Sequence, residues 1–124
     1  MQFCKLANVV WKMIFDKIII NDIAIVKVNT ARATIEKVPE FKLVIQEVLD
    51  ENYTKVIIDL SVCEYIDSTF LGSLVFTQKK LKAAGQEIRL ITVKDSLSTI
   101  FVITSMEKVF KKYISIEQAM ESFL

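Results

Sequence analysis

The stretch Lys55–Val93, KVIIDLSVCEYIDSTFLGSLVFTQKKLKAAGQEIRLITV, predicts a strand, a helix and a second strand in succession. Lys55–Leu60 is a short apolar run with an acid near its end, which is typical of a buried strand. Ser68–Ala84 carries apolar residues at helical spacing, Gly85 suits the stop after its last turn, and Ile88–Val93 is again strand-like. Because strands joined by a helix form right-handed parallel crossovers, this stretch predicts an α/β fold.

Toward the N-terminus, the β-branched runs Ile18–Ile20 and Ile23–Val28 predict an antiparallel hairpin. Only Asn21 and Asp22 separate them, and both residue types tolerate the positive φ angles of a tight turn. A helix is expected behind Pro39, because proline suits the first helical turn. The expected inward positions are Phe41, Val44, Ile45, Val48 and Leu49 in this helix and Leu71, Leu74, Val75 and Leu81 in the helix after it, where Gly72 and Ser73 would allow close packing.

Toward the C-terminus, the pattern predicts a short helix, a strand and a last helix. Asp95 is the expected cap of the short helix, and Lys112–Ile114 is the expected strand. Ser115 and Gln118 have the spacing of a capping box before the last helix. The predicted fold class is therefore a single α/β domain whose mixed β-sheet has an N-terminal antiparallel hairpin followed by parallel βαβ crossovers, covered by about four helices.

Length, charge and cysteine content narrow the class of protein. The 124 residues are enough for one core, and 16 basic against 15 acidic residues leave a net charge of +1, which favours neither nucleic acid nor an anionic membrane. Histidine is absent, and Cys4 and Cys63 lack metal-ligand spacing, so we expect no metal, no cofactor and a reducing cytoplasm. The longest uncharged runs, 68–78 and 96–106, are shorter than the roughly 18 residues that span a bilayer.

The turn Asp67-Ser68-Thr69 is the candidate functional site. It follows the strand Lys55–Leu60, and ligands of parallel sheets gather at the carboxyl ends of the strands. One interpretation is structural, with Asp67 as the N-cap of the next helix and the hydroxyls as polar residues of its first turn. The other is that an exposed hydroxyl accepts a phosphate.

Three segments resemble one protein family. They are VIIDLSVCEYIDSTFLG at 56–72, AAGQEIRLI at 83–91 and ITSMEKVF at 103–110. Together they resemble the STAS domain family, specifically its bacterial anti-sigma-factor antagonists, with the acid-serine-hydroxyl turn as the most specific part. The resemblance covers about residues 15–124. Residues 1–14 are an expected N-terminal extension, within which Met13 is a candidate biological start.

The resemblance implies a regulatory binding module rather than an enzyme. The unmodified protein would capture an anti-sigma factor that is also a serine kinase, and phosphorylation would end the capture, with ATP and Mg²⁺ supplied by the kinase. The family's phosphorylated serine maps onto Ser68, its acid onto Asp67 and its second hydroxyl onto Thr69. The partner-binding residues that we expect are Asp67, Ser68, Thr69, Phe70, Leu71, Asp59, Ser61 and Arg32.

The chain departs from the family pattern at two places near the turn. Phe70 stands where glycine is common, and its bulk would either block a kinase loop or anchor the partner. The loop NTARATIEKVPEF at 29–41 lacks the usual glycine and brings Arg32 and Thr34 toward the same edge. Arg32 is either a phosphate contact or, more simply, an exposed arginine.

Other classes of function fit these residues less well. Asp59 ends a strand like the acceptor of an aspartyl-phosphate receiver, but no acid pair for Mg²⁺ follows the first strand. Asp59 and Asp67 could form an acid/base pair and Cys63 could be a nucleophile, but no histidine base is present. Within STAS domains, a scaffold of a stress-signalling or lipid-transport assembly without a phosphorylation switch stays open. The oligomeric state also stays open.

Overall fold

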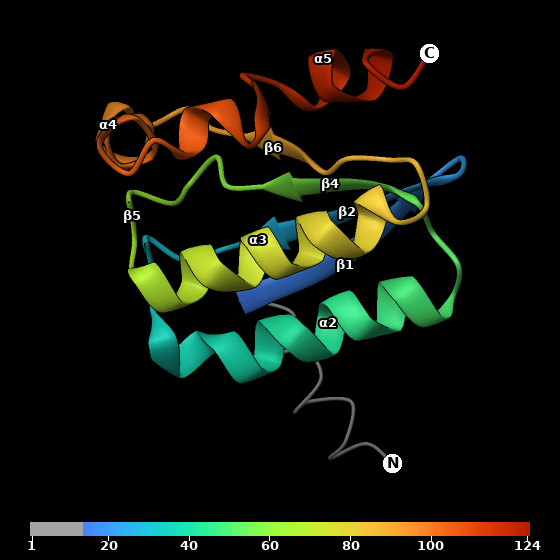
Figure 1. The fold of residues 1–124 in the computed structure, drawn as a ribbon, viewed down its shortest axis with the longest axis horizontal. Coiled ribbons are helices and arrows are strands. Elements are labelled where there is room, and N and C mark those ends of the chain that lie inside the picture. The colour runs from blue at the N-terminus through green and yellow to red at the C-terminus, as the bar shows by residue number, and fades with distance from the viewer. Residues whose placement is uncertain (1–13) are drawn as a thin grey trace.

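The computed structural model describes residues 14–124, which form a mixed five-stranded β-sheet with helices on both faces (Figure 1). The strands are β1 (Phe15–Ile20), β2 (Ile23–Val28), β4 (Lys55–Asp59), β6 (Arg89–Ile91) and β7 (Lys111–Tyr113), in the order β1-β2-β4-β6-β7. The described α-helices are α2 (Val38–Asp50), α3 (Ser68–Lys82), α4 (Asp95–Ile103) and α5 (Ile116–Glu121). Short 3-10 turns, η1 (Ile35–Lys37) and η2 (Met106–Lys108), precede α2 and β7.

The pairing of the strands confirms the predicted mixed sheet. Strand β1 pairs antiparallel with β2, with Ile20 opposite Ile23, and Asn21 takes a φ of 57° in the turn between them. Strands β2, β4, β6 and β7 are joined by parallel pairing, which requires the crossovers through α2 to α4 that the sequence predicted. The carboxyl ends of these parallel strands therefore lie at one edge of the molecule.

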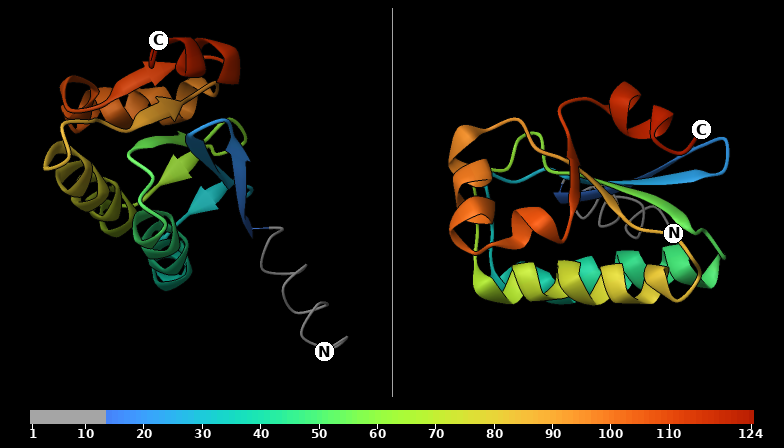
Figure 2. Two further views of the ribbon diagram at one scale, coloured as in Figure 1. Left: turned by 90° about the vertical axis from the view of Figure 1, so that its right-hand side faces the viewer. Right: turned by 45° about the horizontal axis from the view of Figure 1, so that its top comes forward.

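Figure 2 shows α5 on one face of the sheet and α2 and α3 on the other. An apolar cluster lies on each face. Ala24 and Val26 of β2 belong to the larger cluster, which includes buried residues of α2, α3 and α4. Ile23 and Ile25 alternate with them and pack with Ala119 of α5 in the smaller cluster. The sheet is thus buried on both faces, and this explains why its central strands read as continuous apolar runs.

The helices begin and end close to the predicted positions, with several local corrections. Ser115 accepts a hydrogen bond from the N–H of Gln118, as the capping pattern predicted, and Gly85 takes a φ of +78° after α3. The cap predicted at Asp95 is wrong, because Lys94 is the N-cap and Asp95 is the first helical residue. Gly72 faces open space, so it serves no close packing, and Val44, Leu49 and Val75 are only partly buried.

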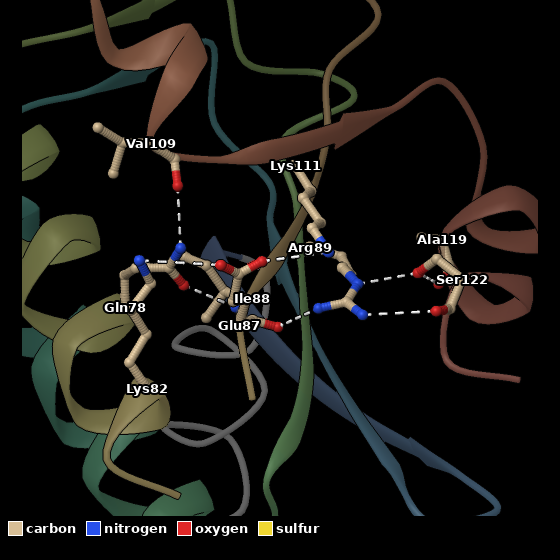
Figure 3. Close-up of polar contacts among 9 residues, drawn as sticks. All are labelled: Gln78, Lys82, Glu87, Ile88, Arg89, Val109, Lys111, Ala119 and Ser122. Atoms are coloured by element: carbon tan, nitrogen blue, oxygen red, sulfur yellow. Dashed lines mark hydrogen bonds and ion pairs between the residues drawn. The ribbon is translucent and has the colours of Figure 1, made fainter. Parts of the chain in front are cut away.

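A buried glutamine and a buried arginine connect the helices to the sheet (Figure 3). Gln78 of α3 donates from Nε2 to the carbonyl of Val109 at 3.0 Å and accepts at Oε1 from the N–H of Ile88 at 2.8 Å. Arg89 of β6 donates from Nε to Oγ of Ser122 at 2.9 Å, which holds the end of α5 on the sheet. Both side chains satisfy backbone or hydroxyl groups at positions where water is largely excluded.

Replacing Gln78 by alanine is expected to lower the free energy of unfolding by about 2–3 kcal/mol. The change leaves the N–H of Ile88 and the carbonyl of Val109 without the partners they have in the folded state. Urea unfolding followed by circular dichroism measures the effect. The matched control is Gln46→Ala at an exposed position of α2, which should change the free energy of unfolding by no more than about 0.5 kcal/mol. Equal losses in the two variants would show that the buried bonds of Gln78 contribute nothing.

Several predictions fall outside the described residues. These are the environment of Cys4, the start at Met13 and the extension at 1–14 apart from Ile14. The carbonyl of Ile14 accepts a hydrogen bond from the N–H of Asn29 at 2.7 Å, just before β1 begins. Between residues 14 and 124, no helix has both the length and the apolar character that crossing a bilayer requires.

Candidate functional site

A second, two-stranded sheet positions the Asp67-Ser68-Thr69 turn. Strand β3 (Arg32–Ala33) pairs in parallel with β5 (Tyr65–Ile66), and α3 starts two residues after β5 ends. In Figure 1, β5 lies at the end of the molecule where β4 terminates, next to the start of α3 and to α4. Oγ of Ser96 in α4 donates to the carbonyl of Glu64 at 2.9 Å, which connects α4 to this end. The turn thus lies on a hydrogen-bonded frame at the carboxyl edge of the main sheet.

Asp67 joins the two segments of this frame through both of its carboxylate oxygens. Oδ1 accepts from the N–H of Phe70 at 2.9 Å, so Asp67 is the N-cap of α3, as the structural interpretation predicted. Oδ2 accepts from the N–H of Ile35 at 2.8 Å, at the start of η1. Because the carboxylate is held from two sides, the backbone before Ser68 has a defined position.

Ser68 and Thr69 are exposed at the first two positions of α3. Within residues 14–124, neither backbone N–H donates a hydrogen bond, as is usual for the first turn of a helix. The helix is 15 residues long and has no acid among its first-turn residues, so the capping carboxylate of Asp67 is the negative charge that meets the partial positive charge of its N-terminus. An added anion at Ser68 would meet free N–H groups and a favourable helix dipole.

The surface beside the turn combines positive charge with exposed apolar groups. The guanidinium of Arg32 stacks over the ring of Tyr65, 4.3 Å from its centroid, and Arg32 is exposed. Ile35 and Val62 are 58% and 48% exposed. Sequence reasoning missed Tyr65 and Ile35, because only the pairing of β3 with β5 brings them beside the turn. Thr34, also expected near this edge, is half-buried and bonded to Glu36.

Phe70 is not on the surface, and the prediction that it contacts a partner or a kinase is wrong. Its side chain is fully buried and packs against Phe41, with ring centroids 4.7 Å apart, and against Phe15 at 6.3 Å. The spacing of four residues between Phe70 and Leu74 is the helical signal for this burial. Leu71 is 8% exposed and also belongs to the core, which leaves little of its side chain for a partner.

Asp59 and Ser61 are not brought together with Ser68. Asp59 pairs in register with Ile91 and therefore shares the sheet face that α5 covers, whereas α3 lies on the other face. It is buried, and its Oδ1 accepts from the N–H of Ser61 at 2.9 Å. These two residues line a separate cavity with the start of α5. Asp59 and Ser61 therefore do not share one surface with Ser68, and their predicted role in partner binding stays a prediction.

Cys63 lies in the core below the turn. Its Sγ contacts the carbonyl of Tyr65 at 3.3 Å, and burial raises the pKa of the thiol. A thiol with a raised pKa carries little thiolate at neutral pH and is a poor nucleophile. Among the described side chains, no group of three metal-ligating residues is placed to hold an ion.

Replacing Asp67 by alanine is expected to cost about 2 kcal/mol of stability, because the change removes the cap of α3 and leaves the N–H of Ile35 unpaired. Asp67→Asn keeps one acceptor oxygen in place of two and should lose about half as much stability. Thermal and urea unfolding measure both variants. Asp95→Ala is the control, since Asp95 makes no cap bond at the start of α4. A loss at Asp67 no larger than at Asp95 would contradict the double role of its carboxylate.

The fold and the site define a class of small α/β domains that present an exposed, capped helix start at the carboxyl edge of a mixed sheet. The family model of the STAS domain matches residues 15–119, and the chain belongs to the STAS domain family. A Thermotoga maritima protein assigned as an anti-sigma factor antagonist is 31% identical over 104 residues, which are 83% of this chain and 91% of that protein.

Solved structures agree with this membership. The crystal structure of a Thermotoga maritima protein, likewise assigned as an anti-sigma factor antagonist, has a TM-score of 0.78 at 28% identity and covers 90% of this chain and 96% of its own. Bacillus SpoIIAA in its phosphorylated form has a TM-score of 0.67 at 12% identity, covering 89% of this chain and 99% of its own. At that identity the likeness to SpoIIAA concerns the fold alone.

Proposed function

We propose that this chain is an anti-sigma factor antagonist that binds an anti-sigma factor and is released by phosphorylation of Ser68. The anti-sigma factor is itself the serine kinase, so this chain needs no catalytic group, and both proteins act in the cytoplasm. The functional domain is residues 15–124. The observation that carries the proposal is the exposure of Ser68 at the free N-terminus of α3, immediately after an acid that is fixed on both sides.

The partner-binding surface is centred on Ser68 and Thr69, with Arg32 beside them. Exposed Ile35 and Tyr65 add apolar contact area on the frame that Asp67 holds. Aromatic and arginine side chains next to apolar area are typical of the energetically important part of a protein interface. Arg32 stacked on Tyr65 provides both.

Phosphorylation would change binding rather than folding. A phosphate adds a charge of about −1.5 to −2 at neutral pH, which the first-turn N–H groups and dipole of α3 can accommodate. The same charge lies next to the carboxylate of Asp67 and would have to be desolvated beneath a docked partner. SpoIIAA has this fold in both its phosphorylated and its unphosphorylated structures, which supports the tolerance of the fold to the modification.

The direct test is incubation of the full chain with the anti-sigma factor kinase of the same organism, ATP and Mg²⁺, followed by peptide mass mapping. We expect one phosphate on the peptide that contains Ser68, no incorporation in Ser68→Ala and normal incorporation in Thr69→Ala. Modification of Thr69, or of neither hydroxyl, would contradict the assignment of Ser68. Stable binding to the kinase after complete phosphorylation would instead indicate a STAS scaffold without a switch.

A further inference from the structure

A cavity of about 260 Å³ lies where β4 and β6 end and α5 begins. Its polar lining consists of Asp59, Ser61, Ser115 and Glu117, and isoleucine side chains form the rest of its wall. The cavity is on the sheet face that α5 covers, so it is separate from the surface around Ser68. One water molecule takes up roughly 30 Å³ in the liquid, so the cavity has room for a larger group.

Asp59 brings an incompletely satisfied carboxylate to this cavity. Asp59 is only 5% exposed, and its Oδ1 accepts one hydrogen bond from the N–H of Ser61. Within the described part of the chain, no donor bonds Oδ2. Every fully buried side-chain nitrogen or oxygen among the described residues has a hydrogen-bond partner. Because Oδ2 of Asp59 has none, this oxygen is not fully buried, and it is accessible to a ligand in the cavity.

No cation of residues 14–124 forms an ion pair with Asp59. Lys27 pairs in register with Asp59 on the neighbouring strand, which places both side chains on the same face, but the two form no ion pair. Taking a carboxylate out of water without a counter-charge is costly. A cation that entered the cavity would recover part of that cost.

The remaining polar groups of the cavity fit a ligand that is rich in hydrogen-bond donors. Asp59 and Glu117 offer only acceptor oxygens in their charged forms, and the hydroxyls of Ser61 and Ser115 can also accept. We infer that the cavity binds an ammonium or guanidinium group, supplied by a lysine or arginine side chain of a protein partner. The isoleucine wall suits the methylene stem that such a side chain carries.

Metal ions are a poorer fit to the same groups. Calcium takes six to eight oxygen ligands and magnesium demands octahedral geometry, whereas this cavity offers two carboxylates and two hydroxyls. The described residues also contain no group of three side chains placed to ligate a metal. The inference does not depend on the proposed function, because it involves neither Ser68 nor a phosphate.

NMR titration of the ¹⁵N-labelled full chain tests the inference. Methylguanidinium chloride is added at constant ionic strength, and methylurea, a neutral molecule of similar shape, is the ligand control. We expect saturable shifts of the Ser61, Ser115 and Glu117 amides with methylguanidinium and at least tenfold weaker binding of methylurea, a factor that corresponds to about 1.4 kcal/mol. Absence of saturable shifts, equal binding of both molecules, or stronger binding of Mg²⁺ would overturn the inference.

Three variants locate the binding. Asp59→Asn, which can still accept from the N–H of Ser61, is expected to weaken methylguanidinium binding about tenfold or more. Glu117→Gln at the exposed rim should weaken it about threefold. Glu121→Gln removes the same charge from α5 outside the cavity and should leave binding within about twofold. Undiminished binding by Asp59→Asn would overturn the site, and if that variant does not fold, the methylurea comparison decides alone.

A second titration identifies the source of the cation. Arginine blocked at both ends, which mimics a side chain in a protein, is compared with free arginine, whose charged ammonium and carboxylate groups are costly to desolvate at the cavity. Blocked arginine is expected to bind at least as tightly as methylguanidinium and several-fold more tightly than free arginine. Tighter binding of free arginine would overturn the assignment to a protein side chain.

Discussion

Phe70→Ala is expected to lower the free energy of unfolding by about 3–5 kcal/mol. Phe70 is fully buried between Phe15 of β1 and Phe41 of α2, so it joins α3 to both neighbouring elements. Truncation removes the apolar area of the ring and leaves a cavity that these neighbours can fill only partly. Aromatic pairing that is lost adds to the cost.

Urea unfolding monitored by far-UV circular dichroism measures this loss of stability. Phe76→Ala is the matched control, because Phe76 lies on the same helix but is 51% exposed, and it should lose about 1 kcal/mol or less. Phe70→Leu keeps part of the ring volume and should lose about 1–2 kcal/mol, which gives a measurable value if the alanine variant is unfolded. Similar losses for Phe70 and Phe76 would contradict the core position of Phe70.

Ser68→Glu is expected to weaken binding to the anti-sigma factor about 100-fold, which is close to 2.7 kcal/mol. Burying a carboxylate beneath a docked partner, next to the carboxylate of Asp67, requires the desolvation of two neighbouring like charges. The same substitution should leave stability unchanged or raise it by about 0.3–1 kcal/mol, because a negative charge at the start of α3 is favourable. Binding should therefore fall without any loss of stability.

Isothermal titration calorimetry with the anti-sigma factor measures this effect. Ser68→Ala should bind within about threefold of the unmodified protein, since a hydroxyl at an exposed position contributes little. Thr54→Glu is the charge control, because Thr54 is exposed immediately before β4, at the end of that strand away from Ser68. Tight binding by Ser68→Glu, or loss of binding by Ser68→Ala, would contradict a docking surface centred on Ser68.

Local sequence signals predicted most of the fold. The turn at Asn21, proline at the start of α2, glycine after α3 and the Ser115 cap each act within a few residues, and each appears in the structure where it was expected. The order of strands and helices then predicted parallel crossovers. The exposed position of Ser68, directly after the acidic cap Asp67, could also be predicted from the sequence, because capping depends on neighbouring residues.

Long-range packing decided the rest of the candidate site. Strands β3 and β5 have two residues each, too few to show a pattern, and they form only because the segments around residues 32 and 65 meet in space. The second hydrogen bond of Asp67 spans 32 residues, to the N–H of Ile35. These contacts determine which apolar groups lie beside Ser68.

The sequence by itself determined the element order, the mixed sheet and the capped helix start, because those follow from propensities and hydrophobic periods read over a few residues. Only the tertiary structure decided that Phe70 packs against Phe15 and Phe41 and that Asp59 lies on the side of α5 instead of beside Ser68. The physical reason is that the burial of a side chain, and the neighbours it meets, depend on how the helices pack against a twisted sheet. That packing is determined by contacts between residues far apart in the chain.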